Sequence, residues 1–161
     1  MISPSFAQSP QCTDVCYVDA AAGNDSNGGS TPDQAKQTIQ AAIDAVQPGG
    51  EIVVAAGEYV EQLFIDKNVS LHGEDANDVI ISAPDTLRNS LPVPSGATTV
   101  RSIVTVRGGA ITSLRSLTIA GPVSASRCED NVSGIYVHQD AQLVLSDAVV
   151  RDVYPSGEGE D

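Results

Sequence analysis

The sequence lacks tryptophan, and aromatic residues of any kind make up only 4% of its 161 residues. The hydrophobic fraction is nevertheless 41%, so the chain should fold. The bulk of its core must then come from Val, Ile, Leu and Ala, which suit stacked β layers. We therefore expect a single domain with a modest β core.

Positive charge is also scarce, because 8 basic residues stand against 21 acidic ones and give a formal net charge of −13. Nucleic acids and anionic membranes both attract positive charge, so neither is expected as a partner. No cofactor is expected either, with Ca²⁺ left open as the exception because the chain is acidic. No apolar run approaches the roughly 20 residues of a membrane-spanning helix, so no membrane span is expected.

The first 16 residues lack the charged and apolar parts of a complete signal peptide. Ser5 and Ala7 still have the spacing of a signal-peptidase site that cleaves after Ala7. We interpret residues 1–16 as the remnant or tail of an export leader. The protein is accordingly expected to be secreted or located on the cell surface.

Three cysteines, Cys12, Cys16 and Cys128, allow at most one internal disulfide bond. The spacing of Cys12 and Cys16 is not a strong zinc or redox motif, and no His lies near Cys12, so no metal site is predicted there. The pairing we consider joins Cys128 to either Cys12 or Cys16. The sequence does not choose between these two partners.

Residues 31–47 have the pattern of an amphipathic helix. Thr31 is the candidate N-cap, Pro32 suits the first helical position, and Gln34 completes a capping box. Pro48 follows the pattern and ends it. The apolar residues fall on one narrow face: Ala35, Ile39, Ala42, Ile43 and Val46. We expect this helix to lie flat on an apolar surface.

From residue 50 onward the sequence consists of short β-like segments that repeat. Residues 103–119 align without a gap on residues 134–150, at a constant separation of 31 residues. A shorter, looser copy begins at Leu63. Strong two-residue turns such as Asn-Gly are absent between neighbouring strands of the copies, which argues against a hairpin meander. The repeat predicts instead a solenoid over residues 50–153, in which each strand pairs with its own copy in the next coil.

Four pieces of residues 17–82 resemble the amino-terminal part of right-handed parallel β-helix proteins of the pectin-lyase-like superfamily. The pieces are "YVDAAAGNDSNGG", "QTIQAAIDAV", "PGGEIVVAAGEYVEQLFI" and "VSLHGEDANDVIIS". The resemblance implies an all-β fold over residues 17–161, a right-handed parallel β-helix with one amino-terminal α-helix that caps the end of the core. It is specific for the fold and not for an activity, because unrelated activities share this fold.

Two insertions, residues 84–101 and 121–133, interrupt the repeats at the same corner of the coil. They are expected to stack beside the sheet formed by the first strand of each copy, where the resemblance implies a carbohydrate groove. Strand alternation places two columns of outward side chains on the floor of that groove. They are Phe64, Thr105 and Tyr136 in one column, and Asp66, Arg107 and His138 in the other. Such columns suit sugar rings and uronic carboxylates, and an ordinary solvated strand face is the alternative.

The resemblance extends to pectin methylesterases, whose catalysis depends on two Asp, an Arg and Gln residues in later coils. Their Gln-Asp-Thr-Leu signature is absent here, and we interpret Gln139 and Asp140 as part of a turn. A pectate lyase would need a carboxylate cluster for Ca²⁺ and an Arg base, and no motif fixes one. The segment "GNDSNGG" offers Asp25 and Asn27 as Ca²⁺ ligands but lacks a closing Glu, so it too is interpreted as a turn. No catalytic or metal-binding residue is assigned.

These observations favour a secreted or cell-surface β-helix module that binds a polysaccharide or a cell-surface glycan, or serves as a structural element, without catalysis. The alternative is the amino-terminal part of a polysaccharide lyase or pectin-esterase-like enzyme that acts on an acidic polysaccharide. The tail "RDVYPSGEGED" resembles the approach to a further coil, so we expect the domain to be incomplete at its carboxyl end. An uncovered last coil would also allow self-association.

Overall fold

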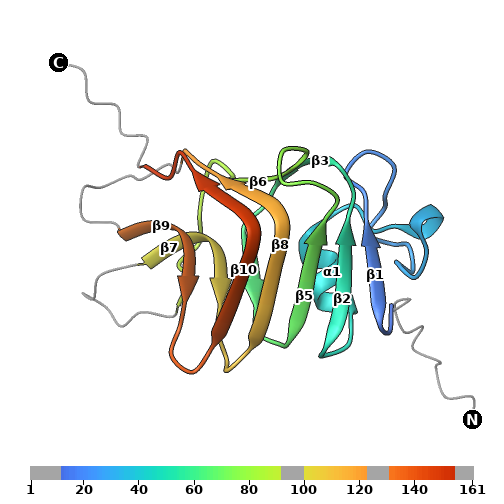
Figure 1. The fold of residues 1–161 in the computed structure, drawn as a ribbon, viewed down its shortest axis with the longest axis horizontal. Coiled ribbons are helices and arrows are strands. Elements are labelled where there is room, and N and C mark those ends of the chain that lie inside the picture. Colours follow the sequence, from blue (N-terminus) through green and yellow to red (C-terminus); the bar gives the residue numbers. More distant parts are fainter. Residues whose placement is uncertain (1–11, 92–99, 123–130, 155–161) are drawn as a thin grey trace, which may run out of the picture.

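The computed structural model describes residues 12–91, 100–122 and 131–154, and in it short strands wind through successive coils (Figure 1). The strands are β1 Val15–Val18, β2 Gly50–Val54, β3 Gly57–Val60, β4 Leu63–Ile65, β5 Val69–Gly73, β6 Val79–Ser82, β7 Val100–Val106, β8 Ile111–Ala120, β9 Asn131–Val137 and β10 Gln142–Arg151. Every pair of neighbouring strands is parallel. The parallel strands exclude a hairpin meander, as predicted.

The strands build three faces around one core. The first face is β1–β2–β5–β8–β10, the second is β3–β6 with the carboxyl halves of β8 and β10, and the third is β4–β7–β9. Both long strands bend between the first and second faces, at Ser116 with φ 54° and at Asp147 with φ 49°. Each coil therefore contributes only a few apolar residues to each face, which explains the short apolar segments of the sequence.

The predicted register between coils is confirmed. Val104 pairs with Ile135 on the third face, and Leu114 pairs with Leu145 on the first. The looser copy also aligns, because Leu63 pairs with Val104. Aligned inward residues form apolar ladders such as Ile52, Leu71, Leu114 and Leu145. The first three rungs of that ladder are buried, whereas Leu145 is 45% exposed because no described residue packs over it.

The predicted helix over residues 31–47 is wrong in its extent. Only Ile39–Ala45 forms the α-helix α1, and Pro32–Gln34 forms a separate 3₁₀ turn, η1. The backbone becomes extended after η1 because Lys36 bridges to Val18 of β1. Thr31 makes no side-chain cap, and Thr38 caps α1 instead by accepting a hydrogen bond from the Ala41 N–H.

The apolar face predicted for this helix is nevertheless buried. Its five residues, Ala35, Ile39, Ala42, Ile43 and Val46, are each at most 4% exposed. Helix α1 packs against β1, β2 and β4 and so lies on the amino-terminal coils of the core (Figure 1). No helix in the described residues is long and apolar enough to cross a membrane.

The disulfide bond joins Cys12 to Cys16, so the predicted pairing of either residue with Cys128 is wrong. A bend at Thr13 and Asp14 turns the chain back, which places the two Cα atoms 5.2 Å apart. Both cysteines are fully buried in the core. Cys128 lies outside the described residues.

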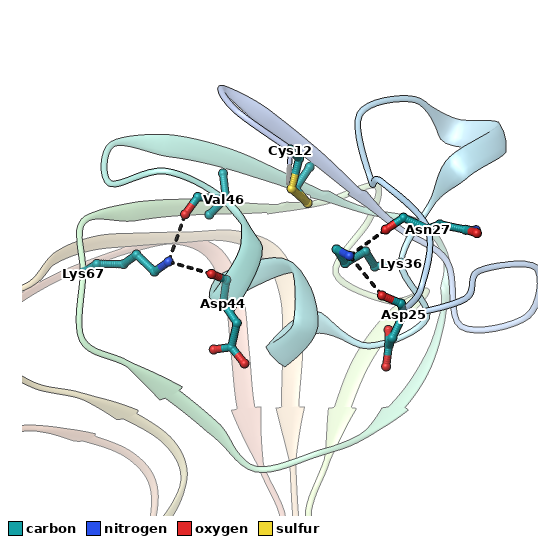
Figure 2. The surroundings of a disulfide bond; sticks show 8 residues. Cys12, Asp25, Asn27, Lys36, Asp44, Val46 and Lys67 are labelled. Carbon is teal, nitrogen blue, oxygen red and sulfur yellow. Dashed lines mark hydrogen bonds between the residues drawn. A yellow bond between two sulfur atoms is a disulfide. The ribbon is translucent and has the colours of Figure 1, made fainter. Parts of the chain in front are cut away.

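The segment "GNDSNGG" forms a loop that is organised by a protein cation, which agrees with its interpretation as a turn. The Lys36 ammonium donates hydrogen bonds to the carbonyl oxygens of Asp25 and Asn27, at 3.0 and 2.7 Å (Figure 2). Lys36 is only 4% exposed. The Asp25 carboxylate accepts from the N–H groups of Gln37 and Thr38 at the start of α1. The described residues contain no cluster of three or more metal-ligating side chains.

Candidate functional site

The outer face of β4–β7–β9 holds the side chains that the sequence predicted for a binding surface. Phe64, Thr105 and Tyr136 pair in register across the three strands, as predicted. The second column also follows the strand ends, because the Arg107 N–H donates to the Ile65 carbonyl and the His138 N–H donates to the Val106 carbonyl. The predicted columns are therefore adjacent in the structure, but their accessibility differs from one coil to the next.

Thr105 is fully buried, so the prediction that it is exposed on the groove floor is wrong. Its hydroxyl oxygen lies 2.8 Å from the Ser102 hydroxyl oxygen, which lies 2.7 Å from that of Ser90. Ser90 belongs to the first insertion, which thus contacts β7 through this chain of hydroxyl groups and through the Ser90 N–H, which donates to the Val100 carbonyl. Alternation placed Thr105 on the correct side of the strand, but it could not show that another segment covers that side.

The covering segment, residues 83–91, is called the strap. The Gln62 amide fixes it to the sheet by donating to the carbonyl oxygens of Arg88 and Ser102, each at 2.9 Å. The Gln62 side-chain oxygen accepts from the Arg88 N–H at 2.8 Å. Leu87 of the strap is buried in the core. The insertion therefore lies beside the predicted sheet, while most of the second insertion, residues 123–130, lies outside the described residues.

The strap brings a second arginine to the face. The guanidinium carbon of Arg88 lies 4.8 Å from the centroid of the Phe64 ring, and that of Arg107 lies 5.1 Å from it. Arg107 also donates a hydrogen bond to the Ser90 carbonyl of the strap at 3.4 Å. We call Phe64, Arg88 and Arg107 the Arg–Phe cluster. Cation–π attraction holds each guanidinium near the ring while its N–H groups remain able to bind another partner.

Helix α1 positions the aromatic ring of this cluster. Gln40 exchanges two hydrogen bonds with the backbone of Phe64, accepting from its N–H at 2.9 Å and donating to its carbonyl at 3.3 Å. Glu61, just before β4, accepts from the N–H groups of Ile39 and Gln40 at 2.8 and 3.0 Å. Burial raises the pKa of the Glu61 carboxyl, and these two hydrogen bonds oppose that rise. The first turn of the helix is thus tied to the strand that carries Phe64.

The last described coil adds two rings to the face. The ring centroids of Tyr136 and His138 lie 6.3 Å apart with their planes tilted by 43°. Both side chains are half-buried, and Asp66 at the end of β4 is exposed. The structure therefore brings Phe64 together with Arg107, and Tyr136 together with His138, while Thr105 is sealed beneath the strap.

Arg88 is the residue that sequence reasoning missed. The insertion was expected beside this sheet, and Arg88 and Arg101 are its only basic residues. That composition could have marked Arg88 as a candidate, but its backbone is held in place by hydrogen bonds exchanged with Gln62, which lies 26 residues earlier in the chain.

The chemistry of the face is that of a donor surface. A guanidinium presents N–H donors in a planar fork that matches a carboxylate. Phe64 and Tyr136 supply flat apolar surface. Arg88 and Arg107 supply the cationic donors of this face, and Asp66, directly after β4, adds an exposed carboxylate to the column of Arg107.

Comparison with known proteins places the fold. No family model matches the chain, and no curated protein matches it. A solved pectin methylesterase in complex with hexasaccharide VII matches at 22% identity with a TM-score of 0.58, over 83% of this chain and 42% of that one. The chain shares the right-handed parallel β-helix fold of that structure.

Two further solved structures agree. Pectin methylesterase PemA from Erwinia chrysanthemi matches at 21% identity with a TM-score of 0.56, over 83% of this chain and 42% of that one. A pectin methylesterase mutant in complex with hexasaccharide IV matches at 19% identity with a TM-score of 0.58, over 84% and 48%. The chain thus spans less than half the length of these neighbours. The predicted fold class is confirmed, and at these identities the similarity concerns the fold alone.

Proposed function

We propose that this chain is a secreted or cell-surface β-helix module that binds an acidic polysaccharide without catalysis. The binding surface is the outer face of β4–β7–β9, and the Arg–Phe cluster is the observation that carries the proposal. Two guanidinium groups lie within 4.8 and 5.1 Å of one aromatic ring on that face. A uronic acid sugar offers the complementary groups, a carboxylate and an apolar ring face.

The acidic composition does not cancel this local positive charge. The chain as a whole carries −13, which would repel a polyanion at long range. The Debye length is only about 8 Å at physiological ionic strength, so charges farther from the ligand than this are largely screened. A carboxylate in contact with Arg88 and Arg107 is attracted by those two groups, and the exposed Asp66 in the column of Arg107 opposes part of this attraction. Binding should consequently be selective for the charged sugar, but the rate of association should be modest.

Export to an oxidising compartment is supported by the Cys12–Cys16 disulfide bond. Structural disulfide bonds persist in secreted and surface proteins and are rare where thiols are kept reduced. Polysaccharide ligands are encountered in the same compartments. The two solved neighbours described with bound hexasaccharides show that this fold accommodates oligosaccharides in those proteins.

Calorimetric titration with hexagalacturonate tests the proposal. Its fully methyl-esterified form is the matched ligand control, because a neutral methyl ester replaces each carboxylate while the sugar rings are unchanged. We expect the charged hexamer to bind more tightly and the variant Arg88→Gln/Arg107→Gln to lose at least about tenfold in affinity, since hydrogen bonds to charged groups contribute about 1.5–3 kcal/mol. The control variant Arg151→Gln should leave the affinity unchanged, because Arg151 is an exposed residue at the end of β10 that pairs with Asp152. Equal binding of both hexamers, or full binding by the double variant, would overturn the proposal.

The alternative function is the amino-terminal part of a pectin-esterase-like or lyase enzyme, which the three pectin methylesterase neighbours favour. Two assays address it directly. Release of methanol from methyl-esterified pectin reports an esterase, and ultraviolet absorbance of the unsaturated product, with and without Ca²⁺, reports a lyase. Turnover in either assay that scales with protein concentration would replace the non-catalytic proposal.

A further inference from the structure

A second candidate surface lies on a different face of the coil. The outer side of the first face, over β2, β5, β8 and β10, is hollowed by an open depression of about 390 Å³. None of its lining residues belongs to the Arg–Phe cluster. The polar side chains that line it are Glu51, Ser70, His72, Ser113, Arg115 and Ser146.

These side chains are aligned by the register of the coils. Glu51, Ser70 and Ser113 occupy one row across β2, β5 and β8. His72, Arg115 and Ser146 occupy the adjacent row across β5, β8 and β10. Successive strands lie about 4.8 Å apart, so each row presents one polar group at every strand spacing. The hollow therefore offers a regular array of hydrogen-bonding groups rather than a single charge.

Hydrogen bonding within the hollow leaves both donors and acceptors available. An Arg115 Nη atom lies 3.1 Å from His72 Nδ1, and a guanidinium can only donate, so Nδ1 accepts and the ring proton resides on Nε2. The Glu51 carboxylate lies 3.7 Å from the same Nδ1 atom, which then has no proton to give it. Glu51 is left as an acceptor, and Arg115 retains further N–H donors.

We propose that this hollow binds a neutral, hydroxyl-rich saccharide, separately from the acidic ligand of the Arg–Phe cluster. A sugar hydroxyl both donates and accepts, so it can satisfy Glu51, Arg115 and the serine hydroxyl groups together. A carboxylate or phosphate ligand would meet Glu51 as well as Arg115, so the repulsion from one offsets the attraction of the other. The two sites therefore differ in the ligand that they favour. The first site has two arginine cations beside the Phe64 ring, whereas the hollow has one carboxylate, Glu51, and one guanidinium, Arg115.

Isotope-edited NMR titration with two neutral hexasaccharides, of galactose and of glucose, tests this site. We expect at least one of them to shift the amide signals of Ser70, His72 and Ser113 at millimolar concentration. Ser113→Phe would fill the hollow from a half-exposed strand position, and an aromatic residue is well tolerated in a strand, so the fold should persist while binding is lost. Glu51→Gln should weaken binding by about tenfold, because it removes the charged acceptor.

Val60→Thr is the matched control, since Val60 is an exposed residue of β3 on the second face and its replacement should leave neutral-sugar binding unchanged. The proposal is overturned if neither hexasaccharide shifts the three amides, or if Ser113→Phe binds normally while its spectrum shows a native fold. A hexagalacturonate that shifts the same amides as strongly would overturn the neutral ligand class. Because Arg107 is absent from the hollow, failure here leaves the acidic-sugar proposal intact, and the reverse also holds.

Discussion

Among individual residues, Lys36 is a buried cation whose ammonium group organises a loop. Its contacts with the Asp25 and Asn27 carbonyl groups close the loop that leads to α1. The sequence offered Asp25 and Asn27 as Ca²⁺ ligands. In the structure the Lys36 ammonium binds the carbonyl oxygens of these two residues. Lys67 makes a similar pair of bonds to the Asp44 and Val46 carbonyl groups, but it is only half-buried (Figure 2).

Replacing the buried lysine should therefore cost much more than replacing the half-buried one. We predict that Lys36→Met lowers the free energy of unfolding by about 3 kcal/mol, because two carbonyl groups lose a charged donor away from water. Lys67→Met should cost about 1 kcal/mol, since water can reach the carbonyl groups it leaves. Urea unfolding of both variants checks the difference, and equal losses would contradict the assigned role of Lys36.

Tyr59 gives a prediction at high pH. Its side chain is buried and donates to the Ala55 carbonyl at 2.8 Å, and burial raises its pKa from 10.0 to about 12. The folded state therefore holds this proton more tightly than the unfolded state. The free energy of unfolding should fall as the pH rises above 10 and should level off above about 12.

Ultraviolet titration of the phenol groups checks this expectation. One phenol should ionise at a pH of about 12, and Tyr59→Phe should remove that step together with the associated loss of stability. A titration in which Tyr59→Phe removes no step at this pH would contradict the burial of Tyr59.

At the residue scale, the sequence predicted on which side of a strand a side chain lies better than it predicted whether that side chain is exposed. Phe64, Tyr136 and Arg107 occupy the predicted columns because strand alternation is a local property. The burial of Thr105 depends on the strap, whose path is fixed by Gln62 and Ser102 through contacts distant in sequence. The Cys12–Cys16 bond was missed because it requires a local bend that cysteine spacing alone does not reveal.

Helix α1 is the element where sequence and structure differ most. Thr31 and Thr38 both precede helix-forming residues, so either could serve as an N-cap. The choice is made by partners from elsewhere in the chain, because Asp25 and Glu61 supply acceptors to the first N–H groups of α1. A pattern within residues 31–47 contains neither partner, which is why the predicted helix began too early.

The two threonines provide a matched test of the helix boundary. We predict that Thr38→Ala lowers the free energy of unfolding by about 1 kcal/mol, the usual cost of losing an N-cap. Thr31→Ala should change it by less than about 0.5 kcal/mol, because Thr31 makes no capping hydrogen bond. Thermal and urea unfolding measure both effects. A larger loss of stability from Thr31→Ala than from Thr38→Ala would contradict the observed boundary and support a helix that begins at Thr31.

For the whole molecule, the stacking of coils was the most predictable feature. A constant separation of 31 residues fixes which apolar residues meet, and the observed pairing of Leu114 with Leu145 follows it. The repeat carries this information because parallel strands pair with their own copies. The groove could not be predicted as completely, because insertions break the repeat and follow paths set by individual hydrogen bonds.

Coil stacking also predicts that the free energy of unfolding lost on replacing a leucine with alanine differs between the rungs of one apolar ladder. Leu114→Ala should lower the free energy of unfolding by about 3 kcal/mol, since the residue is fully buried between coils. Leu145→Ala, at the 45% exposed rung, should cost about 1 kcal/mol. Chemical unfolding of the two variants compares these values. Similar losses at both rungs would mean that Leu145 is covered in solution.

A residue-resolved NMR map with hexagalacturonate tests most directly whether acidic sugar binds on the outer face of β4–β7–β9. We predict that the largest shifts occur at the Phe64 ring, the Arg88 and Arg107 side-chain N–H groups and the Tyr136 ring, with Thr105 unaffected beneath the strap. Shifts confined to other faces, or no shifts at millimolar hexagalacturonate, would contradict it.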